Sequence, residues 1–235
     1  MTAALQHTLT FMRDLRANNS REWFNDHQAA YQAARAAFED FIADLIARFD
    51  AVEDLGGLDL PQAIYRLNRD VRFSADKSPF KPAMSALIGR GRRKAEGRAY
   101  YLQIAPGESF VGSGMYMIFP PELEKIRQVI AADSAPLRAL LNAPDFKRFF
   151  GAMDGEQLKT APKGYPKDHP DIDLLRYKQF TAIHRLTEEQ VIADDLLDHV
   201  IEVCLAVKPF TTYLYDLVGE RDMEVHFRGR AGVEA

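Results

Sequence analysis

The chain has 235 residues, a formal net charge of −4 and 47% hydrophobic residues, which is enough apolar material for a folded core and excludes an intrinsically disordered protein. The negative net charge argues against a generally basic nucleic-acid-binding domain. The first residues, MTAALQHTLT, lack the basic and apolar regions of a secretory signal, and no apolar stretch approaches the about 18 residues that would cross a bilayer. The only cysteine, Cys204, cannot form an intrachain disulfide. We therefore expect a soluble, cytoplasmic protein without a membrane-spanning segment.

Two helices are predicted before residue 50. Leu9, Met12 and Leu15 fall on one face of the first. The second starts at the capping-box spacing of Asn19-Ser20-Arg21-Glu22, and apolar residues then recur at three-, four- and seven-residue steps over residues 20–49.

The hydrophobic period changes from about 3.6 toward 2 after Gly56 and Gly57, which indicates strands. The turn Pro106-Gly107-Glu108 predicts that its two flanking strands pair antiparallel. Gly112, Ser113 and Gly114 would let another backbone or a ligand approach the last strand closely. The predicted strands are 63–67, 84–88, 99–104 and 109–117.

Helical patterns return in the second half of the chain. Pro120-Pro121-Glu122 opens one helix, because proline is tolerated in the first turn. Thr187-Glu188-Glu189-Gln190 is a second capping box, and Pro209 is expected to kink or split the final helix. Further helices are predicted near 136–142, 144–150 and 196–218, with a loop over 159–173 that enters a helix at Pro170.

This order of helices, strands and helices predicts an α+β fold rather than a doubly wound sheet. We expect a single domain over residues 1–218, in which a central, mostly antiparallel sheet at 62–117 is covered by helices from both ends of the chain. Residues 219–235 are interpreted as a C-terminal extension.

Charge is segregated along the sequence. The stretch 62–98 carries ten lysines and arginines against three acids, a net charge of +7, and the remainder of the chain carries −11. Such a basic stretch would attract an anionic ligand. Alternatively, acidic helices pack beside it and neutralise it.

The densest group of polar side chains lies in residues 66–81, directly after the first predicted strand. If the cations converge there, they supply charge-assisted donors for a phosphate or carboxylate, with the two aspartates as orienting groups. Ser74 and Lys77 also fit the Ser-x-x-Lys spacing of some serine nucleophiles, but the serines equally suit turn caps. The candidate ligand-binding residues are Arg66, Asn68, Arg69, Asp70, Arg72, Ser74, Asp76, Lys77 and Lys81.

A second polar group lies in residues 163–173, where His169 stands among carboxylates. An imidazole and carboxylates could serve as acid and base or as metal ligands, and a lysine there could hold an anion. The structural alternative is that the aspartates cap a helix N-terminus. Lys163, His169 and Asp171 are therefore candidate ligand-binding residues that this later segment would add to the site. No metal-ligand spacing supports zinc, so no metal site is predicted.

Glycines and cations also alternate in the loop 89–97, which precedes Tyr100 and Tyr101. Cations followed by aromatics are typical of single-stranded nucleic-acid binding. Because the aromatics fall on a predicted strand and the chain is acidic overall, we favour a solvated hairpin and do not expect a nucleic-acid partner.

Four strings together resemble the bacterial and fungal family catalogued as domain of unknown function 2461: RLNRDVRFSADKSPFK, NNSREWF, AYYLQIAPGESFVGSGMYM and PKGYPKDHPDIDLL. The resemblance covers roughly residues 5–216 and implies one domain, with no reaction or cofactor to transfer. The family pattern often has tyrosine where this chain has Phe80, which argues against a role for a hydroxyl at that position.

Three functional hypotheses follow. The first is a site for a phosphorylated or other anionic small molecule or nucleotide on residues 66–81. The second is a non-catalytic interaction module in which the same residues form a salt-bridge network. The third is a metal-dependent hydrolase or transferase centred on Asp70, Asp76, His169 and Asp171. The residues leave open whether the protein is an enzyme, and they indicate neither a cofactor nor an oligomeric state.

Overall fold

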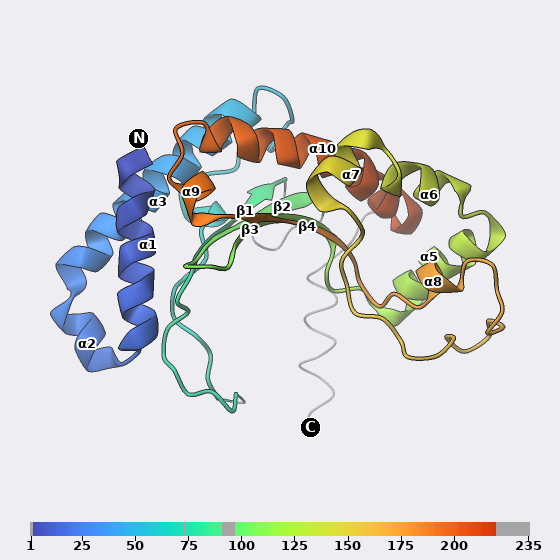
Figure 1. Cartoon of the computed structure of the whole chain (residues 1–235), viewed down its shortest axis with the longest axis horizontal. Helices are drawn as coiled ribbons and strands as arrows, with labels where there is room; N and C mark the ends of the chain where they lie inside the picture. The colour runs from blue at the N-terminus through green and yellow to red at the C-terminus, as the bar shows by residue number, and fades with distance from the viewer. Residues whose placement is uncertain (1, 73, 91–96, 220–235) are drawn as a thin grey trace. The chain divides into compact units, whose positions relative to one another are not determined.

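The computed structural model describes residues 2–72, 74–90 and 97–219, and it has an α+β fold in which helices accompany a four-stranded antiparallel sheet (Figure 1). The predicted fold class is therefore confirmed. Residues 91–96 of the basic loop and residues 220–235 of the expected C-terminal extension lie outside the described residues.

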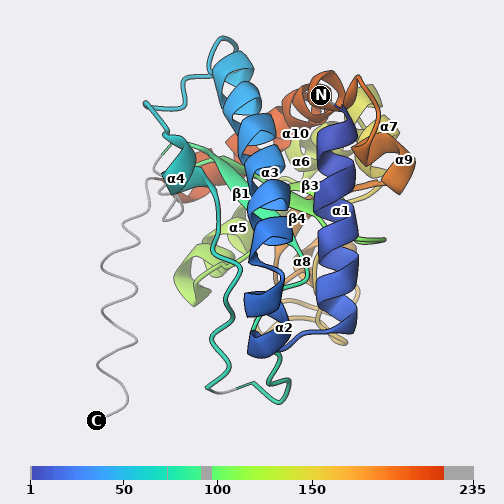
Figure 2. The same ribbon diagram turned by 90° about the vertical axis from the view of Figure 1, so that its left-hand side faces the viewer.

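The N-terminal part forms three helices, α1 (Thr2–Ala17), α2 (Arg21–Asp26) and α3 (Gln28–Phe49). Helices α1 and α3 lie side by side (Figures 1 and 2), because the apolar stripe of one packs on that of the other. Met12 and Leu15 of α1 and Phe38 and Ile42 of α3 are fully buried.

The prediction of one continuous helix from residue 20 to 49 is wrong, because the backbone leaves helical geometry at His27 and separates α2 from α3. The N-cap of α2 is Ser20, whose hydroxyl accepts a hydrogen bond from the Trp23 amide at 3.2 Å. Asn19, the residue at the capping-box spacing, is consequently not the cap.

The predicted strand at 63–67 is also wrong. Asp59 caps a short helical turn, α4 (Leu60–Ala63), by accepting from the Gln62 amide at 3.1 Å. Among the described residues between α4 and position 83, the chain forms two isolated antiparallel bridges, Ile64 with Ala86 and Asn68 with Phe80.

The sheet contains β1 (Met84–Gly89), β2 (Ala99–Ile104), β3 (Ser109–Met115) and β4 (Phe180–Leu186), in that spatial order. The first three match predicted strands, whereas β4 was not predicted. The outer strands are not bare edges, because Ile64 pairs with Ala86 of β1 and Asp154 pairs with Thr181 of β4.

Prolines and caps start most helices of the second half. Pro120, Pro136 and Pro144 stand in the first turns of their helices, and Thr187 and Gln190 form the predicted capping box. The helix predicted to begin at Pro170 begins at Ile172 and is one turn long. The helices are α5 (Pro120–Ala132), α6 (Ala135–Leu141), α7 (Pro144–Phe150), α8 (Ile172–Leu175), α9 (Glu188–Val191) and α10 (Leu196–Val218), the last continuous through Pro209.

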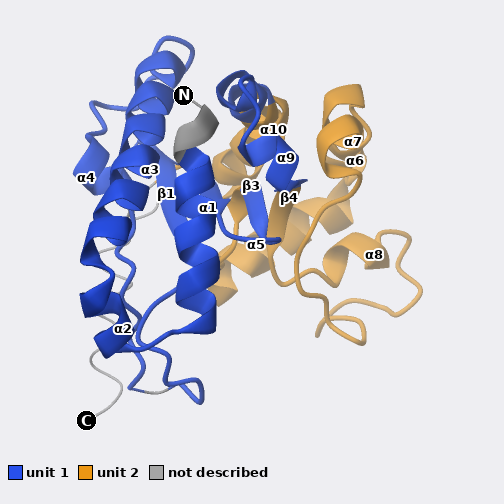
Figure 3. Ribbon diagram, turned by 60° about the vertical axis from the view of Figure 1, so that its left-hand side comes forward, with its two compact units in different colours: residues 1–93, 101–111, 185–202 blue, residues 94–100, 112–184, 203–235 orange. Residues whose placement is uncertain are grey.

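The described residues divide into two compact units (Figure 3). Unit 1 contains those within 1–93, 101–111 and 185–202, and unit 2 contains those within 94–100, 112–184 and 203–235. The single domain expected over residues 1–218 stays a prediction. Among the described residues, no helix has the length and apolar character that crossing a membrane requires.

Candidate functional site

Residues 66–81, called the basic segment from here on, lie in unit 1 and fold back on themselves. The Arg69 amide donates to the Pro79 carbonyl, and the Lys81 amide donates to the Leu67 carbonyl, both at 2.9 Å. Leu67 and Phe80 are buried and anchor the two legs. The intervening turn is thereby held at its base by backbone hydrogen bonds.

Asp76 organises one half of this turn. Its Oδ1 accepts hydrogen bonds from the amide and hydroxyl of Ser78 at 2.9 and 2.6 Å, and its Oδ2 forms an ion pair with Arg69. Arg69 also donates to the Ser74 hydroxyl at 3.4 Å. The hydrogen bonds from Ser78 and the charge of Arg69 hold the pKa of Asp76 well below its usual range.

Asp70 organises the other half. Its two carboxylate oxygens accept from Nε and Nη2 of Arg72 at 3.0 and 2.7 Å, a bidentate arrangement, and Oδ1 also accepts from the Arg72 amide at 3.3 Å. These hydrogen bonds, with the nearby charge of Arg66, lower the pKa of Asp70 to about 2. Asp70 is therefore ionised at neutral pH.

The two ion pairs face water. The side chains of Arg72 and Asp76 are 76% and 58% exposed, and that of Arg69 is 25% exposed. The segment contains five cations and two acids, so three positive charges remain after the aspartates are paired. These are carried by the exposed residues Arg66, Lys77 and Lys81.

These three cations differ in how they are held. Lys77 donates to the Val71 carbonyl at 3.0 Å, and the Lys81 ammonium lies 5.8 Å from the centre of the Tyr65 ring. Arg66 contributes to lowering the pKa of Asp70 through its charge. Asn68 is exposed on the same leg as Arg66.

The second candidate group lies in unit 2, where Asp171 connects two helices. Its Oδ1 accepts from the Ser134 hydroxyl at 2.6 Å and from Nε and Nη2 of Arg138 at 2.9 and 2.7 Å, and Asp173 binds the same guanidinium. The Ser134 hydrogen bond and the Arg138 charge lower the pKa of Asp171. Asp171 precedes α8, so this arrangement joins the start of α8 to the start of α6.

His169 has a defined hydrogen-bonding role. Its Nδ1 accepts from the Asp171 amide at 3.0 Å, so the neutral imidazole carries its proton on Nε2. The ring meets Tyr165 edge to face at 6.5 Å between centroids, and the Tyr165 hydroxyl donates to Glu124 at 3.1 Å. Lys163 is exposed.

The structure therefore distributes the candidate residues over two units. Arg66, Asn68, Arg69, Asp70, Arg72, Ser74, Asp76, Lys77 and Lys81 belong to unit 1, and Lys163, His169 and Asp171 belong to unit 2. Within the parts of the chain that the structure describes, no three histidines, cysteines or acids gather as metal ligands.

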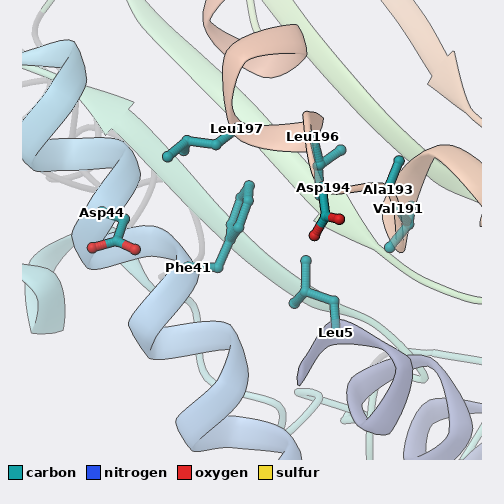
Figure 4. A pocket seen from close by; sticks show the side chains of 8 residues that line it. All are labelled: Leu5, Phe41, Asp44, Val191, Ala193, Asp194, Leu196 and Leu197. Atoms are coloured by element: carbon teal, nitrogen blue, oxygen red, sulfur yellow. The ribbon is translucent and has the colours of Figure 1, made fainter. Parts of the chain in front are cut away.

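A small cavity of about 30 Å³ lies elsewhere in unit 1 (Figure 4). Apolar side chains including Leu5, Phe41 and Leu197 line it, together with Asp44 and Asp194. Its volume suits one or two water molecules rather than a metabolite, so it is not the site for an anionic ligand.

Sequence reasoning missed Asn19, whose side chain holds the backbone of the basic segment at Phe80. Asn19 and Phe80 are 61 positions apart, and neither periodicity nor charge connects them. The available signal was that both lie in the strings NNSREWF and RLNRDVRFSADKSPFK, which carry the family resemblance.

A family model described as conserved hypothetical protein (DUF2461) matches residues 7–213. The chain therefore belongs to the DUF2461 family, as the four strings indicated. Comparisons with curated proteins and with solved structures found no match.

Proposed function

We propose that this member of the DUF2461 family binds a phosphorylated or other anionic small molecule on the basic segment. The observation that carries the proposal is the surplus of positive charge on Arg66, Lys77 and Lys81 after Asp70 and Asp76 have each paired with an arginine. Phosphate and carboxylate groups are the ligands that such donors recognise.

The paired aspartates support binding by ordering the turn before a ligand arrives. Asp76 holds Arg69 and Ser78, and Asp70 holds Arg72. A turn that is already ordered loses less conformational entropy when it binds. The segment thus combines a defined backbone with exposed lysine and arginine side chains.

We propose that this binding takes place in the cytoplasm, where phosphorylated metabolites are abundant. A chain with one cysteine, which can form no internal disulfide, fits that reducing compartment. Neither catalysis nor a cofactor is part of the proposal.

The test is calorimetric titration of the full chain with tripolyphosphate at low salt, compared with a variant carrying Arg66→Ala, Lys77→Ala and Lys81→Ala. Each exposed charge contact contributes up to about 1 kcal/mol, so we expect the triple variant to bind about tenfold or more weakly. Affinity for the wild type is also expected to fall as salt rises. Lys147→Ala, an exposed cation on α7 in unit 2, is the matched control and should bind like the wild type.

Stability separates binding from folding in the same experiment. All three side chains are exposed, so their removal should change the melting temperature by about 6 °C or less and leave the protein folded. Absence of tripolyphosphate binding by the wild type, or unchanged affinity in the folded triple variant, would refute the proposal.

A second candidate function, an interaction module braced by a salt-bridge network, is favoured by the pairing of both aspartates with arginines. It differs in its expectation for Arg69, because a bracing residue cannot be removed without loss of stability.

A further inference from the structure

We infer that Asn19, which precedes α2, is a positioning residue that fixes the basic segment by clamping the backbone of Phe80. The inference deepens the proposed function, because it names what holds the anion-binding residues in place. That Asn19 holds the backbone of Phe80 rests on hydrogen bonds and ring packing and does not depend on anion binding.

The clamp consists of two hydrogen bonds from one side-chain amide. Asn19 Nδ2 donates to the Phe80 carbonyl at 2.9 Å, and Asn19 Oδ1 accepts from the Phe80 amide at 3.1 Å. A side-chain amide pairs with both backbone groups of one residue in only one orientation, with its nitrogen toward the carbonyl. The contact is partly buried, where an unpaired backbone group is costly.

Ring packing reinforces the same connection. The Phe80 ring stacks on Phe24 of α2, with centroids 4.2 Å apart and an angle of 23° between the planes. Phe24 in turn contacts Phe11 of α1 and Tyr31 of α3. Phe80 is 5% exposed. Both its backbone and its side chain are therefore held by the helices that begin the chain, and Figure 2 draws α2 next to the segment that follows α4.

The residues on either side of Phe80 connect the Asn19 clamp to the backbone of the cationic residues. Pro79 accepts from the Arg69 amide, and Lys81 donates to Leu67, so the residues on either side of Phe80 pair with the opposite leg. Fixing Phe80 thus fixes the backbone register of Arg69 and Lys81. Arg69 then positions Asp76 and the turn that Asp76 organises.

Helix capping does not account for Asn19. Ser20 supplies the cap of α2, which leaves the Asn19 amide available for a contact 61 residues away. The adjacent Asn18 behaves in the ordinary way, because its amide donates to the Asp14 carbonyl at the end of α1. Asn18 therefore offers a matched control of the same residue type one position away.

The first measurement is amide hydrogen exchange of the full chain. Losing two hydrogen bonds of ordinary strength should accelerate exchange at Phe80, Lys81 and Arg69 by about tenfold in Asn19→Ala. Asn18→Ala should leave these three amides unchanged. Equal protection of these amides in Asn19→Ala and the wild type would overturn the inference, whether or not the protein binds an anion.

The second measurement uses Asn19→Asp and sucrose octasulfate, a probe whose charge stays constant between pH 7 and pH 4. The carboxylate that this substitution introduces keeps the acceptor for the Phe80 amide but sets a negative oxygen against the Phe80 carbonyl. The variant should therefore bind the probe several-fold more weakly than wild type at pH 7. Protonation near or somewhat above the ordinary aspartate pKa of about 3.9 restores a donor to that carbonyl.

The affinity of Asn19→Asp relative to wild type should consequently rise as the pH falls from 7 to 4, whereas the relative affinity of Asn19→Ala stays low throughout. Asn18→Asp controls for the added charge, because it faces no backbone carbonyl of the basic segment, and its relative affinity should change little above pH 5. A flat pH response of Asn19→Asp would overturn the clamp as the cause. Failure of the wild type to bind the probe would overturn the proposed function, and the exchange measurement would still decide the role of Asn19.

Discussion

Gly114 of β3 provides the sharpest test of the unit 2 backbone. Its φ is +120°, and a β-carbon built on it would lie 2.2 Å from the Phe180 carbonyl oxygen and 2.9 Å from the Thr181 Cα. Both neighbours are backbone atoms of β4, which cannot rotate away as the end of a side chain can. Gly114→Ala therefore forces β3 and β4 apart and places alanine in a conformation that side chains rarely adopt.

These two effects set the expected loss in the free energy of unfolding. Backbone strain contributes about 1–2 kcal/mol, and overpacking contributes about 1–3 kcal/mol. A total near 3 kcal/mol corresponds to a fall of about 6–12 °C in the melting temperature of a chain of this size. Circular dichroism during heating would measure it.

Gly107→Ala is the matched control for this substitution. Gly107 also has a positive φ, +70°, but a β-carbon there meets nothing within 4 Å. Only the conformational strain of about 1–2 kcal/mol applies, so the melting temperature of Gly107→Ala should fall by about 2–8 °C. Equal shifts for the two variants would refute the close approach of the strands as the reason for glycine at position 114.

Two further predictions concern the basic segment. Because hydrogen bonds from Arg72 lower the pKa of Asp70 from 3.8 to about 2, this ion pair should stabilise the folded state above pH 4 and lose its effect as the pH falls through 2. Carbon NMR of the Asp70 carboxyl should give a midpoint near 2 that moves toward 3.8 in Arg72→Ala, and a wild-type midpoint near 3.8 would contradict the bidentate pair. Arg69→Ala should lower the urea midpoint less than Gly114→Ala does, because its partner Asp76 is 58% exposed. A loss as large as that of Gly114→Ala would instead favour the bracing network.

Local patterns predicted the elements whose burial alternates or whose ends carry a strong cap. In β2, buried and half-buried positions alternate over all six residues, and the neighbouring turn supplies Gly107 with a positive φ. The same local logic holds for Pro120 at the start of α5 and for Thr187 at the start of α9. In these elements, each residue's preference agrees with its place in the fold.

Strand β4 escaped prediction because its burial does not alternate. Phe180, Thr181 and Ala182 are buried in succession, so the segment lacks the period of two that identifies a half-buried strand. The error at 63–67 has the opposite cause. Its alternation resembles a strand, but a strand also needs a partner along its length, and pairing occurs only at Ile64 and Asn68.

In the candidate site too, local contacts could be predicted from the sequence and a long-range contact could not. Asp70 with Arg72 and Asp76 with Ser78 are two residues apart, so their hydrogen bonds are contained within the string that drew attention to residues 66–81. Asn19 could not be assigned from that string, because its partner is fixed only when α2 and the basic segment meet. Its neighbouring residues favoured a capping role that Ser20 performs.

The charge balance of the basic segment bears on the choice between the two functional candidates. Five cations within sixteen residues repel one another, and two aspartates offset only part of that repulsion. A network that served stability alone would need Arg69 and Arg72 with their partners, and it would not need a positive charge at positions 66, 77 and 81. The three remaining cations add no ion pair that would offset their repulsion among the described residues of the segment. The proposed function gives these three cations a use, which is to bind negative charge from outside the chain. Under that proposal, removing them should weaken anion binding while leaving the fold intact.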